Sequence, residues 1–217
     1  MATDASYPVQ FSVDYPDREL NRVTTAFRII WIIPITIVLA FLSGGGGWGD
    51  AGAIGADEGT RYSVALGGSG LLFLAPLVMI LFRQKYPRWW FDWNLQLMRF
   101  SSRVGAYLTL LRDEYPSTDE EQAVHLEIPY PDAKNDLNRW LPLVKWLLAI
   151  PHLIILIVLS IAAGVVVFIA WFVILFTGRY PLGLFEFVVG VGRWWNRVTA
   201  YALMLVTDQY PPFRLDP

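Results

Sequence analysis

One series of landmarks occurs twice along the chain, and this repeat constrains the fold more than any other feature of the sequence. The first series opens with VQFSVDYPD (residues 9–17), and the second opens with VHLEIPYPD (residues 124–132). Each then continues through LNR, a proline in an apolar segment, a YP dipeptide, two arginines and DxYP. Equivalent landmarks lie 115 residues apart at the start and 94 residues apart later, so one insertion separates the two series. The pattern predicts a tandem duplication with repeats at residues 1–118 and 119–217.

The composition predicts an integral membrane protein. Hydrophobic residues make up 55% of the 217 residues, charged residues only 17%, and mean hydropathy is +0.42. Such a chain is too apolar for an ordinary soluble domain. The net charge of -2 gives no basic field for nucleic acid. The absence of cysteine excludes disulfides, thiolate metal sites and a cysteine nucleophile.

Three apolar segments are candidates for membrane spans: residues 29–42, 64–82 and 147–176. A span needs about 20 residues, so the last segment is too long for one helix. It accommodates two helices if the chain turns at Ala162–Gly164 and Lys145 snorkels towards water. We therefore expect a mainly α-helical membrane protein with four transmembrane helices, arranged as two parallel-repeated hairpins.

The distribution of cations predicts the orientation of these hairpins. Sixteen of the seventeen lysines and arginines would lie on one side of the membrane, and only Arg61 lies in the first hairpin loop. Cytoplasmic loops accumulate such residues, so both termini are expected in the cytoplasm. The glycine-rich loop at residues 43–59 would then face the exterior.

Each repeat is expected to add a strand and a helix outside the hydrocarbon. Apolar and polar residues alternate at residues 9–15 and 124–130, which indicates two half-buried strands, antiparallel if they meet. Their open edges could recruit partners, or the ribbon could be a lid on the protein's own helices. Residues 88–111 and 182–206 are amphipathic and begin near tryptophans, which favours cytoplasmic interfacial helices.

Two arginine pairs with i, i+4 spacing are the strongest candidate binding residues. Each pair points one way from its helix and could bind the phosphates of anionic lipids. Alternatively, each pair could form salt bridges with an acidic residue seven positions earlier, or with the aspartates of the YPD and DxYP motifs. The candidate residues are Arg99, Arg103, Arg193, Arg197, Asp92 and Glu186.

His152 is the one histidine predicted at membrane depth, and an ionisable group there is a candidate functional site. It could relay protons or bind a metal, but its equivalent in the first repeat is Ile35. We therefore favour a structural, hydrogen-bonding role. Neither repeat contains a known catalytic or metal-binding motif, so we expect no cofactor, no metal and no enzyme activity.

The ordered landmarks resemble those of the bacterial membrane-protein family called domain of unknown function 4389. The residues that carry the resemblance are the strands ending in YP, LNR, IPH (150–152), the cation before YP, FDW (91–93), FEF (185–187) and DxYPPF (208–213). The resemblance spans nearly the whole chain, as two copies. Ile35 and the glycine-rich insertion depart from it. It implies a location in the bacterial cytoplasmic membrane, but no activity or cofactor.

These observations lead to one functional expectation and two alternatives. We expect a non-catalytic accessory subunit or scaffold of a membrane complex, with cytoplasmic docking and lipid-contact surfaces. Its partners would be the bilayer, anionic lipids, and other membrane subunits or further copies of itself, but not nucleic acid. The first alternative is a small homo-oligomeric channel or transporter that uses His152. The second is a lipid-modifying enzyme that uses interfacial carboxylates and arginines.

Overall fold

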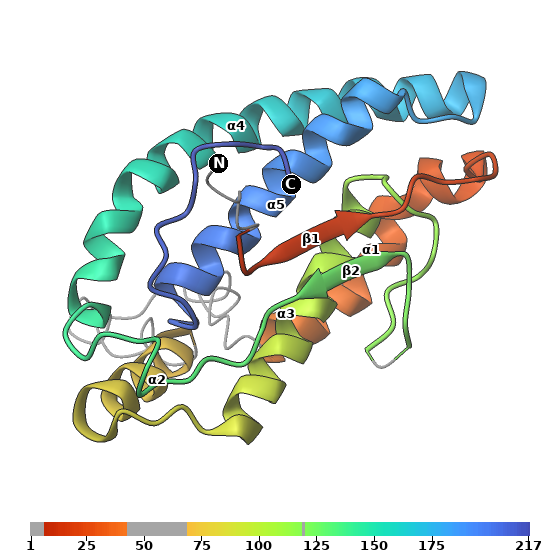
Figure 1. Ribbon diagram of the computed structural model, residues 1–217. Coiled ribbons are helices and arrows are strands. Elements are labelled where there is room, and N and C mark those ends of the chain that lie inside the picture. The colour runs from red at the N-terminus through yellow and green to blue at the C-terminus, as the bar shows by residue number, and fades with distance from the viewer. Residues whose placement is uncertain (1–6, 43–68, 119) are drawn as a thin grey trace, which may run out of the picture.

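A computed structural model describes residues 7–42, 69–118 and 120–217 (Figure 1). The predicted extracytoplasmic loop at residues 43–59 lies outside the described residues. In chain order, the described elements are β1 (Gln10–Val13), α1 (Arg22–Leu42), α2 (Ser69–Arg83), α3 (Arg88–Leu108), β2 (Val124–Glu127), α4 (Pro142–Thr177) and α5 (Leu182–Ala202).

β1 and β2 form a two-stranded antiparallel sheet, as the alternating pattern predicts. Phe11 pairs with Leu126, and Val13 with Val124. All four side chains are buried, whereas the intervening polar residues are exposed. The apolar face of the sheet rests on two helices, β1 on α5 and β2 on α3 (Figure 1).

Both predicted amphipathic segments are helices, but each ends before its expected boundary. Leu110 and Leu205 take positive φ angles of 66° and 58°, which right-handed helix cannot accommodate. The amide of Leu111 then donates a hydrogen bond to the carbonyl oxygen of Ala106 at 3.0 Å, which caps the last turn of the helix. α3 therefore stops at Leu108, and α5 stops at Ala202.

α4 is one continuous helix of 36 residues, so the predicted turn at Ala162–Gly164 is wrong. Alanine is the strongest helix former, and one glycine costs a helix only about 1 kcal/mol, so nothing local breaks the helix there. It ends instead at Gly178, whose φ of 75° closes the last turn through a bond to the Ile174 carbonyl. Figure 1 shows α4 as an arc that passes over α5.

The four-span arrangement is therefore wrong. Among the described residues, α4 is the one helix that is long and apolar enough to cross a membrane, and α1 would be a second if counted across its 56° bend. Pro34 lies five residues after that break, and a proline inside a helix clashes with the carbonyl four residues earlier, here that of Ile30, which favours bending of this region. The described part of α2, which starts at the first described residue after position 68, has 15 residues, or about 22 Å, against a hydrocarbon core of about 30 Å. The prediction that both termini lie on one side of the membrane depended on an even number of spans. Without the four-span arrangement, that prediction no longer follows.

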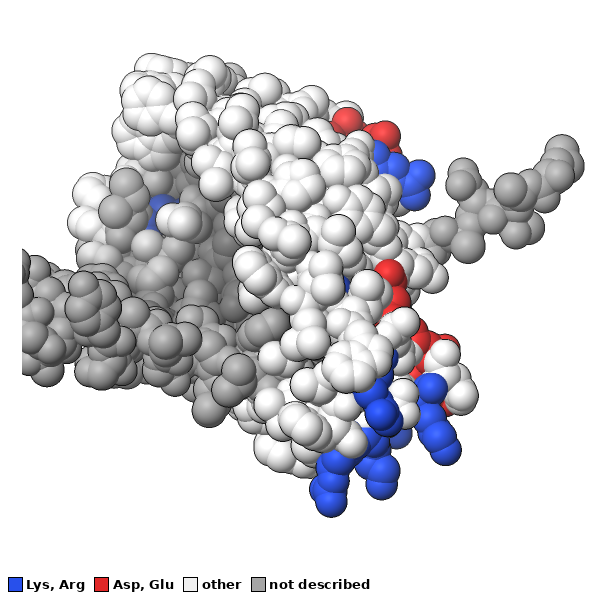
Figure 2. All heavy atoms as spheres, turned by 90° about the vertical axis from the view of Figure 1, so that its left-hand side faces the viewer, with Lys and Arg blue, Asp and Glu red and all other residues white. Residues whose placement is uncertain are grey.

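α4 combines extreme hydropathy with exposure, which distinguishes it from the core helix of a soluble protein. Its most apolar window has a mean hydropathy of 3.2, yet only 11% of that window is buried. Large exposed side chains along it include Ile154, Ile157, Val158, Ile161, Val165, Phe168 and Phe176. Charged side chains gather along one margin of the molecule, and most of the remaining face is uncharged (Figure 2). A contiguous apolar surface of this kind supports contact with a membrane.

Candidate functional site

Arg28 lies inside the apolar helix α1 and is held by three groups from the end of α3 and the segment that follows it. Its guanidinium forms an ion pair with Asp113 and donates 2.9 Å hydrogen bonds to the carbonyls of Tyr107 and Arg112. The second carboxylate oxygen of Asp113 accepts the amide of Asn21 at 2.6 Å. Asp113 thereby joins the LNR segment to the buried cation of α1.

Lys145 of α4 makes similar contacts with the segment that follows α5. Its ammonium lies 2.7 Å from the Asp208 carboxylate and donates a 2.7 Å hydrogen bond to the carbonyl of Thr207. Asp208 also accepts the amide of Asn138 at 2.6 Å. We call each of these arrangements a clasp: the Arg28 clasp and the Lys145 clasp.

The Lys145 clasp corrects one sequence expectation and reveals residues that sequence analysis missed. Lys145 is fully buried and does not snorkel to water. The available signal was that Arg28 and Lys145 are cations at matching places in otherwise apolar segments, 117 residues apart. Each cation pairs with the aspartate of a DxYP motif, which the sequence had suggested only as a partner of the paired arginines.

The predicted arginines bind backbone carbonyls. Arg99 of α3 donates through Nε to Leu126 in β2 at 3.0 Å, and Arg193 of α5 donates through Nε to Phe11 in β1 at 3.0 Å. These bonds tie α3 to β2 and α5 to β1. These bonds occupy carbonyls in the middle of both strands.

The second arginine of each pair is buried beneath a chain segment that follows its helix. Arg103 donates to the Ser117 carbonyl at 2.9 Å, and Arg197 donates to the carbonyls of Arg214 and Asp216 at 3.3 and 2.9 Å. Burial lowers the pKa of the Arg197 guanidinium. The chain after α5 is therefore tied back across that helix.

Asp92 and Glu186 do not join these arginines. Both acidic side chains are exposed, and neither takes part in an ion pair among the described residues. The structure therefore brings each arginine pair to backbone acceptors, and leaves the two carboxylates at the surface.

The YP tyrosines connect segments that lie far apart in the sequence. The Tyr130 hydroxyl donates to the carbonyl of Tyr86, and the Tyr15 hydroxyl donates to that of Tyr180. The Tyr86 hydroxyl in turn donates to the Met204 carbonyl at 2.8 Å. Burial raises the pKa of the Tyr86 and Tyr180 hydroxyls, because the phenolate is poorly solvated there.

His152 is fully buried in an aromatic enclosure. Its Nδ1 accepts the indole N–H of Trp194 at 3.1 Å. Phe213 stacks on its ring with centroids 4.0 Å apart, and the Tyr210 centroid lies at 4.7 Å. Nε2 has no hydrogen-bond partner in the described part of the chain. The other histidine, His125, is exposed and contacts Asp14 at 3.0 Å. No three potential metal ligands come together among the described residues.

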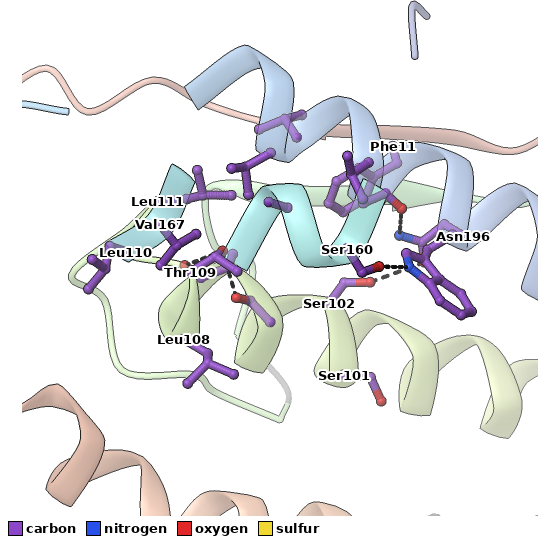
Figure 3. A pocket seen from close by; sticks show the side chains of 18 of the residues that line it. Phe11, Ser101, Ser102, Leu108, Thr109, Leu110, Leu111, Ser160, Val167 and Asn196 are labelled. Carbon is purple, nitrogen blue, oxygen red and sulfur yellow. Dashed lines mark hydrogen bonds between the residues drawn. The ribbon is translucent and has the colours of Figure 1, made fainter. Parts of the chain in front are cut away.

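A cavity of about 960 Å³ lies among α3, α4 and α5. Figure 3 shows Ser102, Ser160 and Asn196 together at one end, and leucines including Leu110 and Leu111 towards the other. One end thus carries a cluster of polar side chains. The other is mainly aliphatic, although Thr109 lies among its leucines and Arg28 bonds to carbonyls beside them.

The polar end is built from short contacts between helices. The Ser102 hydroxyl lies 3.3 Å from Asn196 Oδ1, and the Trp195 indole N–H donates to Ser160 Oγ at 2.9 Å. Arg28 is the one charged residue among the described residues that line the cavity, and its clasp neutralises it. Sequence analysis singled out none of the polar-end residues, because their proximity depends on how three helices pack.

Comparison with known proteins identifies similarity in one part of the chain. Residues 140–214, from the start of α4 to the segment over His152, match the family model described as "Domain of unknown function (DUF4389)". This match covers one copy, the second of the two in the sequence interpretation. No curated protein and no solved structure matches the chain.

Proposed function

We propose that this chain is a non-catalytic protein of the bacterial cytoplasmic membrane that serves as an accessory subunit or scaffold of a membrane complex. The exposed apolar length of α4 carries the proposal, because that surface gains most by contact with lipid. The two equivalent clasps support a tandem duplication, with the family match marking the second copy.

The buried charges favour an architectural role. Arg28, Lys145, Arg103 and Arg197 are each held by groups of the same chain. Buried ions need such partners, and these partners connect the helices to the segments that follow them. The ribbon is better explained as a lid than as a docking edge, since arginine side chains occupy its mid-strand carbonyls.

A group of exposed cations offers a surface for anionic lipid headgroups. We call it the basic rim; its residues are Arg83, Lys85, Arg88, Lys134 and Arg139. A 3.1 Å hydrogen bond between Arg139 and Gln84 joins the segments that carry it, and Figure 2 shows lysines and arginines gathered at the lower margin. Trp89 and Trp140 are exposed beside it. Cations and tryptophans together are typical of a membrane–water interface.

Membrane extraction followed by reconstitution tests the proposal. The full chain should stay in the membrane pellet after alkaline carbonate washing, because α4 holds it by apolar contact. Purification in mild detergent should recover further membrane subunits with it. Recovery in the soluble fraction would overturn the membrane assignment. A homo-oligomer that conducts protons or potassium in liposomes would replace the scaffold proposal with a channel.

A further inference from the structure

We propose that the cavity among α3, α4 and α5 binds a neutral, single-chain lipid whose head carries a hydrogen-bond acceptor, of the monoacylglycerol class. This assignment goes beyond membrane anchoring, because it concerns a ligand held in a partly open cavity between helices rather than lipid around the protein.

The cavity has the size and shape for such a molecule. Its volume of about 960 Å³ lies near the top of the range of roughly 300–1,000 Å³ for ligand sites in proteins. Leu110, Leu111 and Val167 line the region away from the polar end (Figure 3). An aliphatic chain can therefore lie along the cavity while its head stays at the serines.

The polar end can hydrogen-bond a head group. Ser160 accepts the Trp195 indole N–H at 2.9 Å, and among the described residues no acceptor is in reach of its own hydroxyl proton. A hydroxyl carries one proton to donate, so Ser160 is free to bind an ester carbonyl. The neighbouring Ser102 and Asn196 are joined by a long contact of 3.3 Å, which a ligand hydroxyl can replace.

The charge of the lining selects against ionic lipids. Arg28 is the one charged residue in the described lining, and the carboxylate of Asp113 neutralises its charge. Its Nη1 donates to two carbonyls, and its buried Nε has no hydrogen-bond partner among the described residues. A carboxylate or phosphate would enter an apolar space without a free counter-ion, at a large cost in solvation. A fatty acid or phospholipid is therefore a poorer ligand than a neutral lipid of equal chain length.

Two glycines show that open space lies beside the helices. A Cβ atom added at Gly105 of α3 or at Gly164 of α4 would meet no atom within 4 Å. Glycines in helix contacts usually let two backbones approach closely, but these two line the cavity instead. A larger side chain at Gly164 can therefore occupy the cavity without displacing backbone.

Photolabelling of the full chain tests this site. The protein is placed in phosphatidylcholine nanodiscs with a monoacylglycerol that carries a diazirine near the end of its chain. Labelling should reach Leu111 or Val167, saturate at one probe per chain, and be competed by unlabelled monoolein. Oleate should compete about tenfold less well, because its carboxylate loses solvation.

Variants distinguish labelling within the cavity from labelling by probe in the surrounding bilayer. Gly164→Leu should abolish competed labelling, while Gly183→Leu, whose added side chain also meets open space but outside the cavity lining, should leave it intact. Ser160→Ala should weaken competition by monoolein about fivefold through the loss of one hydrogen bond. Circular dichroism melting verifies that each variant folds.

Three outcomes would overturn the assignment. Labelling confined to lipid-facing residues such as Ile157, or labelling unchanged in Gly164→Leu, would show that the cavity takes no such lipid. Equal competition by oleate would reject a neutral ligand. The Gly164→Leu variant should resist carbonate extraction from the membrane whether or not the cavity binds lipid. A negative labelling result would therefore reject the lipid site without rejecting the proposed scaffold function.

Discussion

The Lys145 ammonium lies 2.7 Å from the Asp208 carboxylate, although Lys145 belongs to the most apolar helix of the described chain. Lys145 is fully buried, whereas the Asp208 side chain keeps 21% of its surface exposed. This contact joins the start of α4 to the segment after α5, so it fixes the ends of two helices with one ion pair.

Replacing Lys145 by methionine should destabilise the fold by about 3–5 kcal/mol, because removal of one partner leaves Asp208 partly buried and uncompensated. Chemical unfolding in detergent, followed by circular dichroism, measures the change. The matched exposed variant Lys85→Met should change the unfolding free energy by less than about 0.5 kcal/mol. Equal effects at the two lysines would contradict the importance of the Lys145 clasp.

Neutralising the basic rim should reduce the enrichment of anionic lipid around the protein. The triple variant R83Q/K85Q/R88Q is expected to lose about 1 kcal/mol per cation of attraction to an anionic surface. Mass spectrometry of lipids that co-purify from mixed phosphatidylglycerol and phosphatidylcholine nanodiscs measures the enrichment.

The control for the basic rim lies near the start of α1. The variant R18Q/R22Q/R179Q removes as many exposed cations, but there Glu19 lies 3.8 Å from Arg179 and offsets part of the charge. It should lower phosphatidylglycerol enrichment less. If the two triple variants behave alike, net charge and not the rim controls the lipid preference.

Stability should fall as the pH rises above 10, partly through Tyr86. Burial raises the pKa of its hydroxyl above the ordinary value of 10.0, so the unfolded chain loses this proton at lower pH than the folded chain does. The protonated Tyr86 hydroxyl therefore contributes fully to folding stability below pH 10, and this contribution is lost as the pH rises towards the pKa of the folded state. Tyr86→Phe should lose about 1 kcal/mol at neutral pH, with the bond to Met204, and show a flatter decline above pH 10. Parallel declines for the two proteins would exclude Tyr86 as a source.

Trp194→Phe should destabilise the fold by about 1–3 kcal/mol, since it leaves Nδ1 of buried His152 without its donor. Trp89→Phe, at a tryptophan that is 69% exposed, is the matched control and should be close to neutral. Thermal melting of both variants compares them. If Trp194→Phe leaves the melting temperature unchanged, the hydrogen bond from the indole N–H to His152 does not contribute to stability.

The continuity of α4 can be measured directly, because the chain has no cysteine. Spin labels on Ile154→Cys and Phe172→Cys should lie about 25 Å apart along one helix. A turn at Ala162–Gly164 would bring the same positions face to face, within about 10 Å. Pulsed electron paramagnetic resonance in nanodiscs distinguishes the two, and the shorter distance would restore a hairpin.

Elements with a local periodic signal were predictable from sequence. Alternation at residues 9–15 and 124–130 indicated the strands, and helical spacing indicated α3 and α5, because burial on one face imposes a period on the residues that form it. The end of α4 at Gly178 also follows from a glycine signal. The continuity of the helix at Gly164 was not predicted. The expected hairpin came from comparison of the two series of landmarks, and no local residue pattern indicated a helix end there.

The partners of charged residues were beyond sequence analysis. Spacing placed Arg99 and Arg103 on one face, and the acidic residue seven positions earlier was a reasonable partner. The structure assigns them backbone carbonyls instead, and every residue carries a carbonyl, so no pattern of side chains can identify which one is used.

By itself, then, the sequence determined the apolar character of the chain, its recurring landmarks, its two strands and its amphipathic helices. Tertiary structure alone decided that α4 stays continuous, that Asp113 and Asp208 hold buried cations, and that three helices leave a cavity between them. The physical reason is range: periodicity and propensity act over a few residues, whereas Lys145 and Asp208 meet across 63 positions, where only packing brings them together.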